Sequence, residues 1–337
     1  VGEGIIVLFG NNESPSNYPA NGYTPFRQDS SFLYFFGQHR DGLVGFIDID
    51  NNDEWLIGND IEVEDIVWMG FTPSVADLAA EVGILKAAPM AQLRQLCCDA
   101  VSANRKIHFL PPYRYDTKIQ IMDLMGIHPS KQKETASLKL IQAVVKQRAT
   151  KSAEEIAYID AACDIGYVMH TTAQLLIKPG VTERFVAGQV DGIARSLAQG
   201  NSFGTIFSQH GEIMHGTPSD SPLEDGRLVL CDAGCELNDY CSDQTRTIWF
   251  GSHPSSQYQT TLELVQRAQT KAMEMMRPGV KMCDVYAKAR SVFEEVGVEK
   301  AFNHGLGHGI GTSCHQNPPL ISTLSKDIIK PYQTHSI

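Results

Sequence analysis

We predict a two-domain α/β protein from three features of the sequence. The 337 residues are enough for about two domains, and the 42% of hydrophobic residues can supply their cores. Over roughly the first 125 residues, short apolar runs alternate with helical patterns, as in an α/β domain. A second composition begins near Arg148, after a Lys- and Gln-rich stretch. We therefore expect an N-terminal domain at residues 1–128, a linker helix at 129–150 and a second domain at 151–337.

The N-terminal domain has a clear alternation of strand and helix signals. Apolar runs and β-branched residues predict strands, and amphipathic patterns between turn residues predict helices. The predicted strands are residues 4–9, 42–49 and 106–110, and the predicted helices are residues 73–82 and 90–103.

The second domain begins with a helix whose N-terminus is marked in the sequence. Ser152 and Glu155 have the spacing of a capping box, in which each side chain binds a free backbone N–H group. A long helix should follow and stop before Pro179, and Thr182 should cap the next one. Strands are then predicted at 227–232 and 242–250, and helices at 257–276 and 284–296.

Charge and composition exclude several classes of function. The net charge of −11 and the pI near 5.4 argue against a nucleic-acid or acidic-membrane partner, which would need a basic face. We find no apolar run near the ~20 residues that span a bilayer, and we expect the first residues, which lack a basic n-region, to form a strand instead of a signal peptide. The eight cysteines form no C-x-x-C pair, which favours reduced thiols in a cytoplasmic protein.

Two aspartates lie at the ends of the predicted strands of the second domain. Residues 228–231 are all apolar, so we expect this strand to be buried on both faces, with Asp232 at its end. A hairpin around Asn238-Asp239 would place Asp243 nearly opposite Asp232. Two carboxylates that close repel each other unless a cation lies between them. The alternative is that Asp232 caps a turn while Asp243 pairs with Arg246, and the strands alone leave both interpretations open.

The stretch H-G-L-G-H-G-I-G-T-S-C-H, at residues 304–315, contains three of the eleven histidines. Each of its glycines costs about 1 kcal/mol in a helix interior, so we expect an extended or turning backbone. His304 and His308 would then point to the same face. Together with the two aspartates they offer a mixed set of nitrogen and oxygen ligands. Such a set is more typical of an Mn²⁺ site than of a zinc site with thiolate ligands. A lone histidine is usually structural, and we interpret His108, His128 and His170 in that way.

At this point the chain resembles the pita-bread metallopeptidases, and among them aminopeptidase P and prolidase. Three segments carry the resemblance: L-C-D-A-G-C-E-L-N-D-Y-C-S-D-Q-T-R-T at 230–247, H-G-L-G-H-G-I-G at 304–311 with His315 after it, and Y-T-P-F-R-Q-D-S-S-F-L-Y-F-F-G at 23–37. The resemblance implies an N-terminal creatinase-like α/β domain followed by a pita-bread fold, a curved and mainly antiparallel sheet covered by helices.

The resemblance also implies a metal site. Asp232 would bind one metal ion, Asp243 would bridge both, and His308 would bind the other. The cofactor would be two divalent ions, most simply Mn²⁺, with Co²⁺ or Zn²⁺ as alternatives. Two such ions about 3.5–4 Å apart share a hydroxide that attacks the scissile carbonyl. The implied activity is that of an Xaa-Pro aminopeptidase acting on peptides with proline at the second position.

The remaining site residues follow from the same resemblance. Thr245 would orient one of the carboxylates from outside the ligand set. The implied catalytic and substrate-binding residues match the substrate-side histidines of the family: His215, His304 and His315. The family also suggests a homodimer, and Arg27, Gln28 and Asp29 would bridge domains or subunits or form an ordinary surface ion pair.

Two departures from the family pattern limit these implications. The family has five metal ligands, two of them glutamates on its last strands, and the sequence reaches Ile337 before either. We therefore expect a sequence that is incomplete at its C-terminus and holds few or no metal ions by itself; the alternative is a truncated, inactive relative. Gln316 replaces an acidic residue that often follows the last histidine.

Three other activities compete with this prediction. Prolidase would act only on Xaa-Pro dipeptides, and its motifs are the same. A metal-free creatinase-like relative or pseudoenzyme keeps the fold but loses the ligands, whereas Asp232, Asp243 and His308 are all present. Methionine aminopeptidase normally lacks the N-terminal domain and fits less well.

Overall fold

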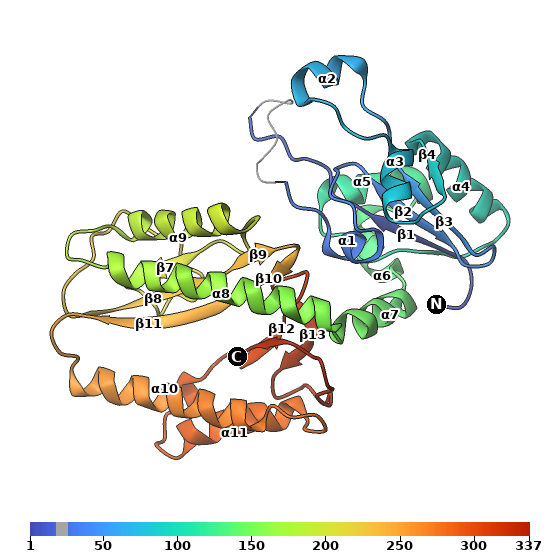
Figure 1. Cartoon of the computed structure of the whole chain (residues 1–337). Coiled ribbons are helices and arrows are strands. Elements are labelled where there is room, and N and C mark those ends of the chain that lie inside the picture. The colour runs from blue at the N-terminus through green and yellow to red at the C-terminus, as the bar shows by residue number, and fades with distance from the viewer. Residues whose placement is uncertain (18–25) are drawn as a thin grey trace. The chain divides into compact units, whose positions relative to one another are not determined.

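The computed structural model describes residues 1–17 and 26–337. The chain divides into two compact units, Val1–Val144 and Val145–Ile337, and each combines helices with β-sheet (Figure 1). The boundary falls inside helix α7 (Leu138–Ala149). The mixed α/β fold predicted from the sequence is confirmed.

The first unit is built on a five-stranded mixed sheet in the order β4-β3-β2-β1-β5. β1 and β3 each pair antiparallel with β2, whereas β5 and β4 add parallel to β1 and β3 at the two edges. The predicted strands at 4–9, 42–49 and 106–110 are confirmed, with somewhat shorter bounds. The strands are β1 (Ile5–Phe9), β2 (Val44–Asp48), β3 (Asp53–Ile57), β4 (Lys86–Ala88) and β5 (Ile107–His108).

Helices cover both faces of this sheet, because alternate residues of a strand point to opposite sides. Ile5 and Val7 of β1 pack with α4, whereas Leu8 packs with α1, α3 and α7. The result is a three-layer α/β/α core. The helices of this unit are α1 (Ser30–Phe36), α2 (Val63–Met69), α3 (Val75–Glu81), α4 (Met90–Ser102), α5 (Tyr115–Met125), α6 (Pro129–Thr135) and the first part of α7.

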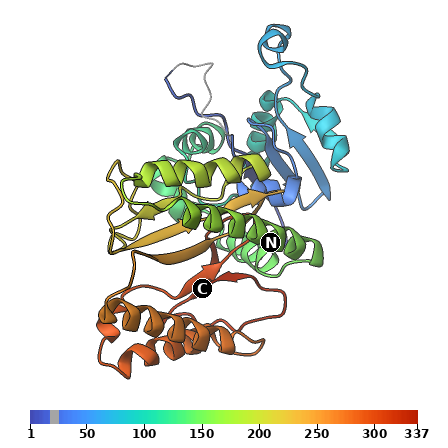
Figure 2. The ribbon, with the colours of Figure 1, turned by 60° about the vertical axis from the view of Figure 1, so that its left-hand side comes forward.

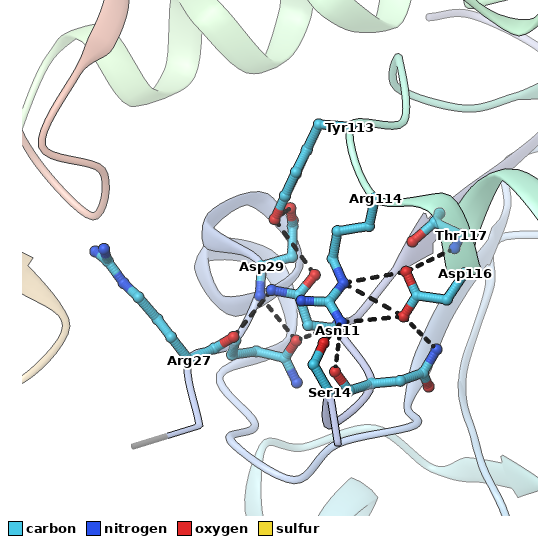
Figure 3. A network of polar contacts seen from close by, with 10 residues as sticks. Asn11, Ser14, Arg27, Asp29, Tyr113, Arg114, Asp116 and Thr117 are labelled. Carbon is cyan, nitrogen blue, oxygen red and sulfur yellow. Dashed lines mark hydrogen bonds and ion pairs between the residues drawn. The ribbon is translucent and has the colours of Figure 1, made fainter. Parts of the chain in front are cut away.

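The motif at 23–37 forms part of a polar network of the first unit (Figure 3); its residues 23–25 lie outside the described part of the chain. Asp29 caps α1 by accepting hydrogen bonds from Ser31 and Phe32 N–H, and it also accepts one from the hydroxyl of Tyr113 at 3.0 Å. Gln28 is 5% exposed and binds the backbone of Asn11 and Arg40. The side chains of Gln28 and Asp29 therefore fix local structure, whereas the side chain of Arg27 points away from the other residues labelled in Figure 3.

A second part of the network fastens the start of α5 to the segment after β1. Arg114 donates to the carboxylate of Asp116 at 3.1 Å and to the hydroxyl of Ser14 at 2.7 Å. Asn12 donates to the same carboxylate at 3.1 Å. These contacts belong wholly to the first unit and stabilise its loops (Figure 3).

The second unit contains the end of α7, three small sheets, four further α-helices and one short 3₁₀ helix. Helices α8 (Ala153–Leu176) and α9 (Glu183–Leu197) cover the sheet β11-β8-β7, and the main core lies between them (Figures 1 and 2). The strands are β6 (Gly200–Asn201), β7 (Ile206–Ser208), β8 (Arg227–Ala233), β9 (Cys235–Leu237), β10 (Tyr240–Cys241), β11 (Gln244–Phe250), β12 (Gly307–Gly309), β13 (Gln316–Ile321) and β14 (His335–Ser336).

A second core lies beneath two further helices. Helices α10 (Ser256–Met275) and α11 (Met282–Glu294) pack side by side and against β13 (Figure 1), and the short 3₁₀ helix η1 (Glu299–Ala301) follows. Across residues 1–17 and 26–337, none of the helices has the length and apolar character that crossing a bilayer requires. All eight cysteines are free thiols.

The predicted helix caps of the second unit are confirmed, whereas the predicted burial of one strand is not. The capping box of Ser152 and Glu155 begins α8, and Thr182 caps α9 by accepting from Phe185 N–H. The expectation that strand 227–232 is buried on both faces is wrong. Val229 is fully buried under the helices, but Leu228 points to the other face of β8 and stays partly exposed.

Candidate active site

The backbone of β8 and β11 positions the two aspartates. The strands pair antiparallel with Thr245 opposite Asp232, so Asp243 lies just before the strand that faces Asp232. Between them, Gly234 allows the chain to pass from β8 to β9, because a Cβ atom there would lie 2.0 Å from the carbonyl oxygen of Ser242. Asn238 and Asp239 form the predicted turn with φ of 47° and 73°, as a two-residue hairpin loop requires.

Asp232 is a half-buried carboxyl group that lacks a full set of partners. Within the described residues, its Oδ1 atom is buried and accepts no hydrogen bond. Burial raises the pKa of Asp232 to about 6, and the charge of Asp243 raises it further, against the lowering effect of a hydrogen bond from Thr245. An unpaired buried charge is costly, so this oxygen is suited to accept a proton or a cation.

Asp243 pairs with His308, which resolves the alternative left open by the sequence. The Nε2 atom of His308 lies 3.2 Å from Oδ2 of Asp243, and their side chains are only 16% and 11% exposed. Burial raises the pKa of Asp243, but the hydrogen bond and charge of His308 lower it below its ordinary value overall. Arg246 instead donates to the carbonyl of Thr245 at 2.7 Å, so the proposed Asp243–Arg246 pair is wrong.

The glycine-rich stretch is extended where it passes the aspartates, as predicted. Strand β12 places His308 between β13 and β14. A side chain at Gly307 could not fit, because its Cβ atom would lie 2.1 Å from the carbonyl oxygen of Ser336. The ring of His315 lies beside that of His308, with centroids 4.3 Å apart. Desolvation and the neighbouring His308 lower the pKa of His315.

The other two predicted histidines behave differently. His215, on an exposed loop, lies near enough to lower the pKa of both Asp232 and His315. His304 precedes β12, is exposed, and makes an edge contact with the ring of Phe302 at 5.2 Å. β12 includes His308 but not His304, so the extended backbone that was expected to align the two side chains does not reach His304.

Two groups near the site were missed by sequence reasoning. His335 lies opposite Gly309 in the β12–β14 pair. Burial lowers the pKa of His335 to about 4, and the nearby charges of Lys151 and His308 act in the same direction. Its Nε2 atom is buried and makes no hydrogen bond within the described residues. Lys151 is also buried, and this burial lowers its pKa to about 8. Neither residue has a local motif, and the position of His335 in the segment Y-Q-T-H-S-I was the available signal.

A polar cluster holds the loop that carries His315. The guanidinium of Arg148 donates to the hydroxyls of Thr312 at 2.9 Å and Ser313 at 2.8 Å. The amide of Gln316 donates to the carbonyl of Arg148 at 2.6 Å. The glutamine that departs from the family pattern is therefore tied to the same arginine as the loop, and it fixes the backbone next to His315.

The donors present suit a divalent cation in their chemistry. Asp243 and His308 lie near enough to Asp232 to affect its pKa, and Asp232 has a buried oxygen without a hydrogen-bond partner within the described residues. Carboxylate and imidazole groups are the ligand types that manganese-like ions accept. As arranged, no group of three His, Cys, Asp or Glu side chains in the described part of the chain could hold a metal ion. Asp243 is engaged with His308 instead.

Both parts of the chain match known protein families. Residues 157–337 match the profile of metallopeptidase family M24, and residues 1–108 match the aminopeptidase P N-terminal domain. An uncharacterized peptidase of Staphylococcus epidermidis is 35% identical over 178 residues, which are 52% of this chain and 50% of that protein. The match thus spans about half the length of this relative.

Solved structures share the fold. Proline aminopeptidase P II from Yersinia pestis superposes with a TM-score of 0.81 at 24% identity, over 98% of this chain and 82% of that one. Prolidase from Pyrococcus horikoshii superposes with a TM-score of 0.77 at 24% identity, over 99% and 85%. The predicted combination of an aminopeptidase-P-type N-terminal domain and a pita-bread domain is confirmed.

Proposed function

Because the chain belongs to metallopeptidase family M24, we propose that it is a metal-dependent exopeptidase that hydrolyses the Xaa-Pro bond at the N-terminus of peptides. The observation that carries the proposal is the buried, unpartnered oxygen of Asp232 beside the Asp243–His308 pair. A protein retains such a costly group where a ligand completes it.

Three side chains would hold the metal ions: Asp232, Asp243 and His308. Two divalent ions, when bound, supply a nucleophilic water at neutral pH and polarise the scissile carbonyl. Mn²⁺ suits these ligands best, with Co²⁺ and Zn²⁺ as alternatives. Thr245 lies opposite Asp232 in the β8–β11 pair and would orient that carboxylate.

Three histidines would serve the substrate. The lowered pKa of His315 keeps its imidazole neutral near pH 7, so one ring nitrogen can accept a hydrogen bond while the other donates one. His215, near Asp232 and His315, would contact the same reacting group and pass a proton to the leaving nitrogen. His304, whose ring contacts that of Phe302, would also face the substrate, as the family resemblance implies.

The length of the peptide decides between two activities in the proposed class. The aminopeptidase P N-terminal domain supports an aminopeptidase, whereas the fold also resembles a prolidase. We expect Mn²⁺-dependent release of the first residue from an Xaa-Pro-Xaa tripeptide, loss of turnover in chelator, and loss in Asp243→Asn. Turnover of an Xaa-Pro dipeptide alone would identify a prolidase, and turnover of neither peptide would contradict the proposal.

A metal-free relative is the second candidate, because Asp243 and His308 can pair with each other directly, at 3.2 Å. Elemental analysis of the protein after dialysis against Mn²⁺ separates the two. A stoichiometric, chelator-sensitive metal content supports the peptidase, and no metal content supports the relative.

A homodimer is the assembly we propose. Helix α2 exposes apolar side chains, among them Trp68, which is 84% exposed, with Val67 and Phe71 beside it. Exposed apolar patches of this kind mark interaction surfaces, and a second copy would cover them. Sedimentation equilibrium should give a dimer that Trp68→Ser weakens; a monomer at all concentrations would refute this assembly.

A further inference from the structure

Glu183 is a buried carboxylate outside the candidate active site. It is the first residue of α9 and is only 2% exposed. A buried carboxylate needs a cation or several hydrogen-bond donors. Its donors here are neutral: the hydroxyls of Ser208 and Ser219 and the backbone N–H groups of Gln209 and Ser219.

The two carboxylate oxygens bind the two ends of one segment, residues 209–218. Oε1 accepts from the Ser208 hydroxyl at 3.1 Å and from Gln209 N–H at 2.7 Å. Oε2 accepts from Ser219 N–H at 3.1 Å and from the Ser219 hydroxyl at 2.7 Å. The Glu183 side chain thus joins the two ends of the segment that contains His215, and the Gln209 side chain adds a link from the near end to Pro222 and Glu224.

The near end of this segment is already tied to the aspartate strand. β7 ends at Ser208 and pairs antiparallel with β8, with Ile206 opposite Asp232. The far end belongs to no strand of that sheet; its backbone contacts run to the start of α9, where Arg184 N–H donates to the Ser219 carbonyl at 2.9 Å. Glu183 therefore couples the far end to the strand that positions Asp232.

The middle of the segment is held weakly. Ile213 N–H donates to the His210 carbonyl at 2.9 Å, and His210 pairs with Glu212 on the surface. Ile213 and Met214, next to His215, are exposed. Segments with few buried apolar contacts are the ones that open locally, so the position of His215 depends on how the ends are held.

We propose that Glu183 is a positioning residue that holds segment 209–218 so that His215 faces Asp232 and His315. The role assigned to His215 rests on the proposed function, whereas the ordering of the segment does not. A carboxylate suits this task because both of its oxygens only accept hydrogen bonds. Glutamine keeps one acceptor oxygen, and its NH₂ group can donate to a serine hydroxyl but cannot accept from a backbone N–H, so either Gln209 N–H or Ser219 N–H loses its acceptor.

The protonation state agrees with this role. Burial raises the pKa of Glu183, but the hydrogen bonds from Ser219, Gln209 and Ser208 lower it below its ordinary value overall. The carboxylate is therefore ionised at neutral pH and able to accept from all of its donors, and charged acceptors form the stronger hydrogen bonds.

The test compares Glu183→Gln and the milder Ser219→Ala with Thr182→Ala in the complete chain. Thr182→Ala removes the cap of α9, a hydrogen bond to Phe185 N–H, without touching the carboxylate. Amide exchange followed by mass spectrometry should quicken about tenfold or more across 209–219 in Glu183→Gln, less in Ser219→Ala, and hardly at all in Thr182→Ala. The His215 imidazole signal in NMR, assigned with His215→Gln, should move in the first variant only.

Three outcomes decide the matter. Unchanged exchange and an unmoved His215 signal in Glu183→Gln would overturn the proposal. Equal loosening in Thr182→Ala would assign the effect to helix α9 and overturn it as well. If Glu183→Gln loosens the segment while the unaltered chain cleaves no Xaa-Pro peptide, positioning stands and the proposed function fails. With both upheld, Glu183→Gln should lower kcat/KM about tenfold or more, as loss of a hydrogen bond to a charged group does.

Discussion

Replacing Asp232 with asparagine should stabilise the metal-free protein while removing its response to metal. The pKa of this carboxyl is raised in the folded state, mainly by burial, so folding favours the protonated form. Its contribution to stability is complete below the unfolded pKa and is lost as the pH rises through about 6. The amide introduced by Asp232→Asn carries no charge, so the penalty at neutral pH should disappear.

The size of the effect follows from the pKa. The pKa of Asp232 rises from an ordinary 3.8 to about 6, and each pKa unit corresponds to about 1.4 kcal/mol. The upper limit is therefore about 3 kcal/mol, and partial solvent screening together with the unsatisfied amide reduces it to about 1–2 kcal/mol. The wild-type chain should lose this amount of stability between about pH 4 and pH 7, and Asp232→Asn should not.

The measurement is urea unfolding in chelator at pH 5 and pH 7.5, repeated with Mn²⁺. Asp48→Asn is the matched control, because a hydrogen bond from Arg105 lowers the pKa of Asp48 to about 2. The same chemical change there should cost about 1–2 kcal/mol at pH 7.5. Mn²⁺ should raise the stability of the wild type but not of Asp232→Asn. A chelated Asp232→Asn that is less stable than wild type at pH 7.5 would refute the reasoning.

Three further predictions concern the scaffold. Arg148→Met should lower the free energy of unfolding by about 2–3 kcal/mol, because the hydroxyls it binds lose a charged donor; urea unfolding checks this, and a loss well below about 1 kcal/mol would contradict it. Gly234→Ala should lower the free energy of unfolding by about 3 kcal/mol or more, or prevent folding, because its Cβ atom would overlap a backbone oxygen. Gly188→Ala, in the open interior of α9, should instead raise the free energy of unfolding by about 0.5–1 kcal/mol. Ser152→Ala should lower the thermal midpoint through loss of about 1 kcal/mol of capping, and an unchanged midpoint would mean that the cap is dispensable.

Local signals were interpreted correctly where the physical cause is local. The hairpin turn at Asn238-Asp239, the caps at Ser152 and Thr182, and the extended backbone at Gly307–Gly309 all follow from residues within a few positions of each other. The approach of Asp232 and Asp243 was also predictable from local signals, because a short turn fixes the register of the antiparallel strands that it joins.

Partners that are distant in the sequence could not be predicted in the same way. The face of β8 with Leu228 was expected to be buried, yet which face a helix covers depends on how α8 and α9 pack, not on the strand itself. His304 was grouped with His308 by spacing, but strand β12 includes only His308 because β13 and β14 pair there. Arg246 was an equally good partner for Asp243 until the sheet brought His308 to it.

By itself, the sequence determined the α/β class, the family, and the residue types offered to a metal: two carboxylates at strand ends and an imidazole in a glycine-rich strand. Only the tertiary structure decided that Asp232 keeps a buried oxygen without a partner, that Asp243 faces His308, and that Glu183 closes the segment of His215. Chain geometry specifies turns and caps over a few residues. The burial and hydrogen-bond partners of a polar group depend on every segment packed around it.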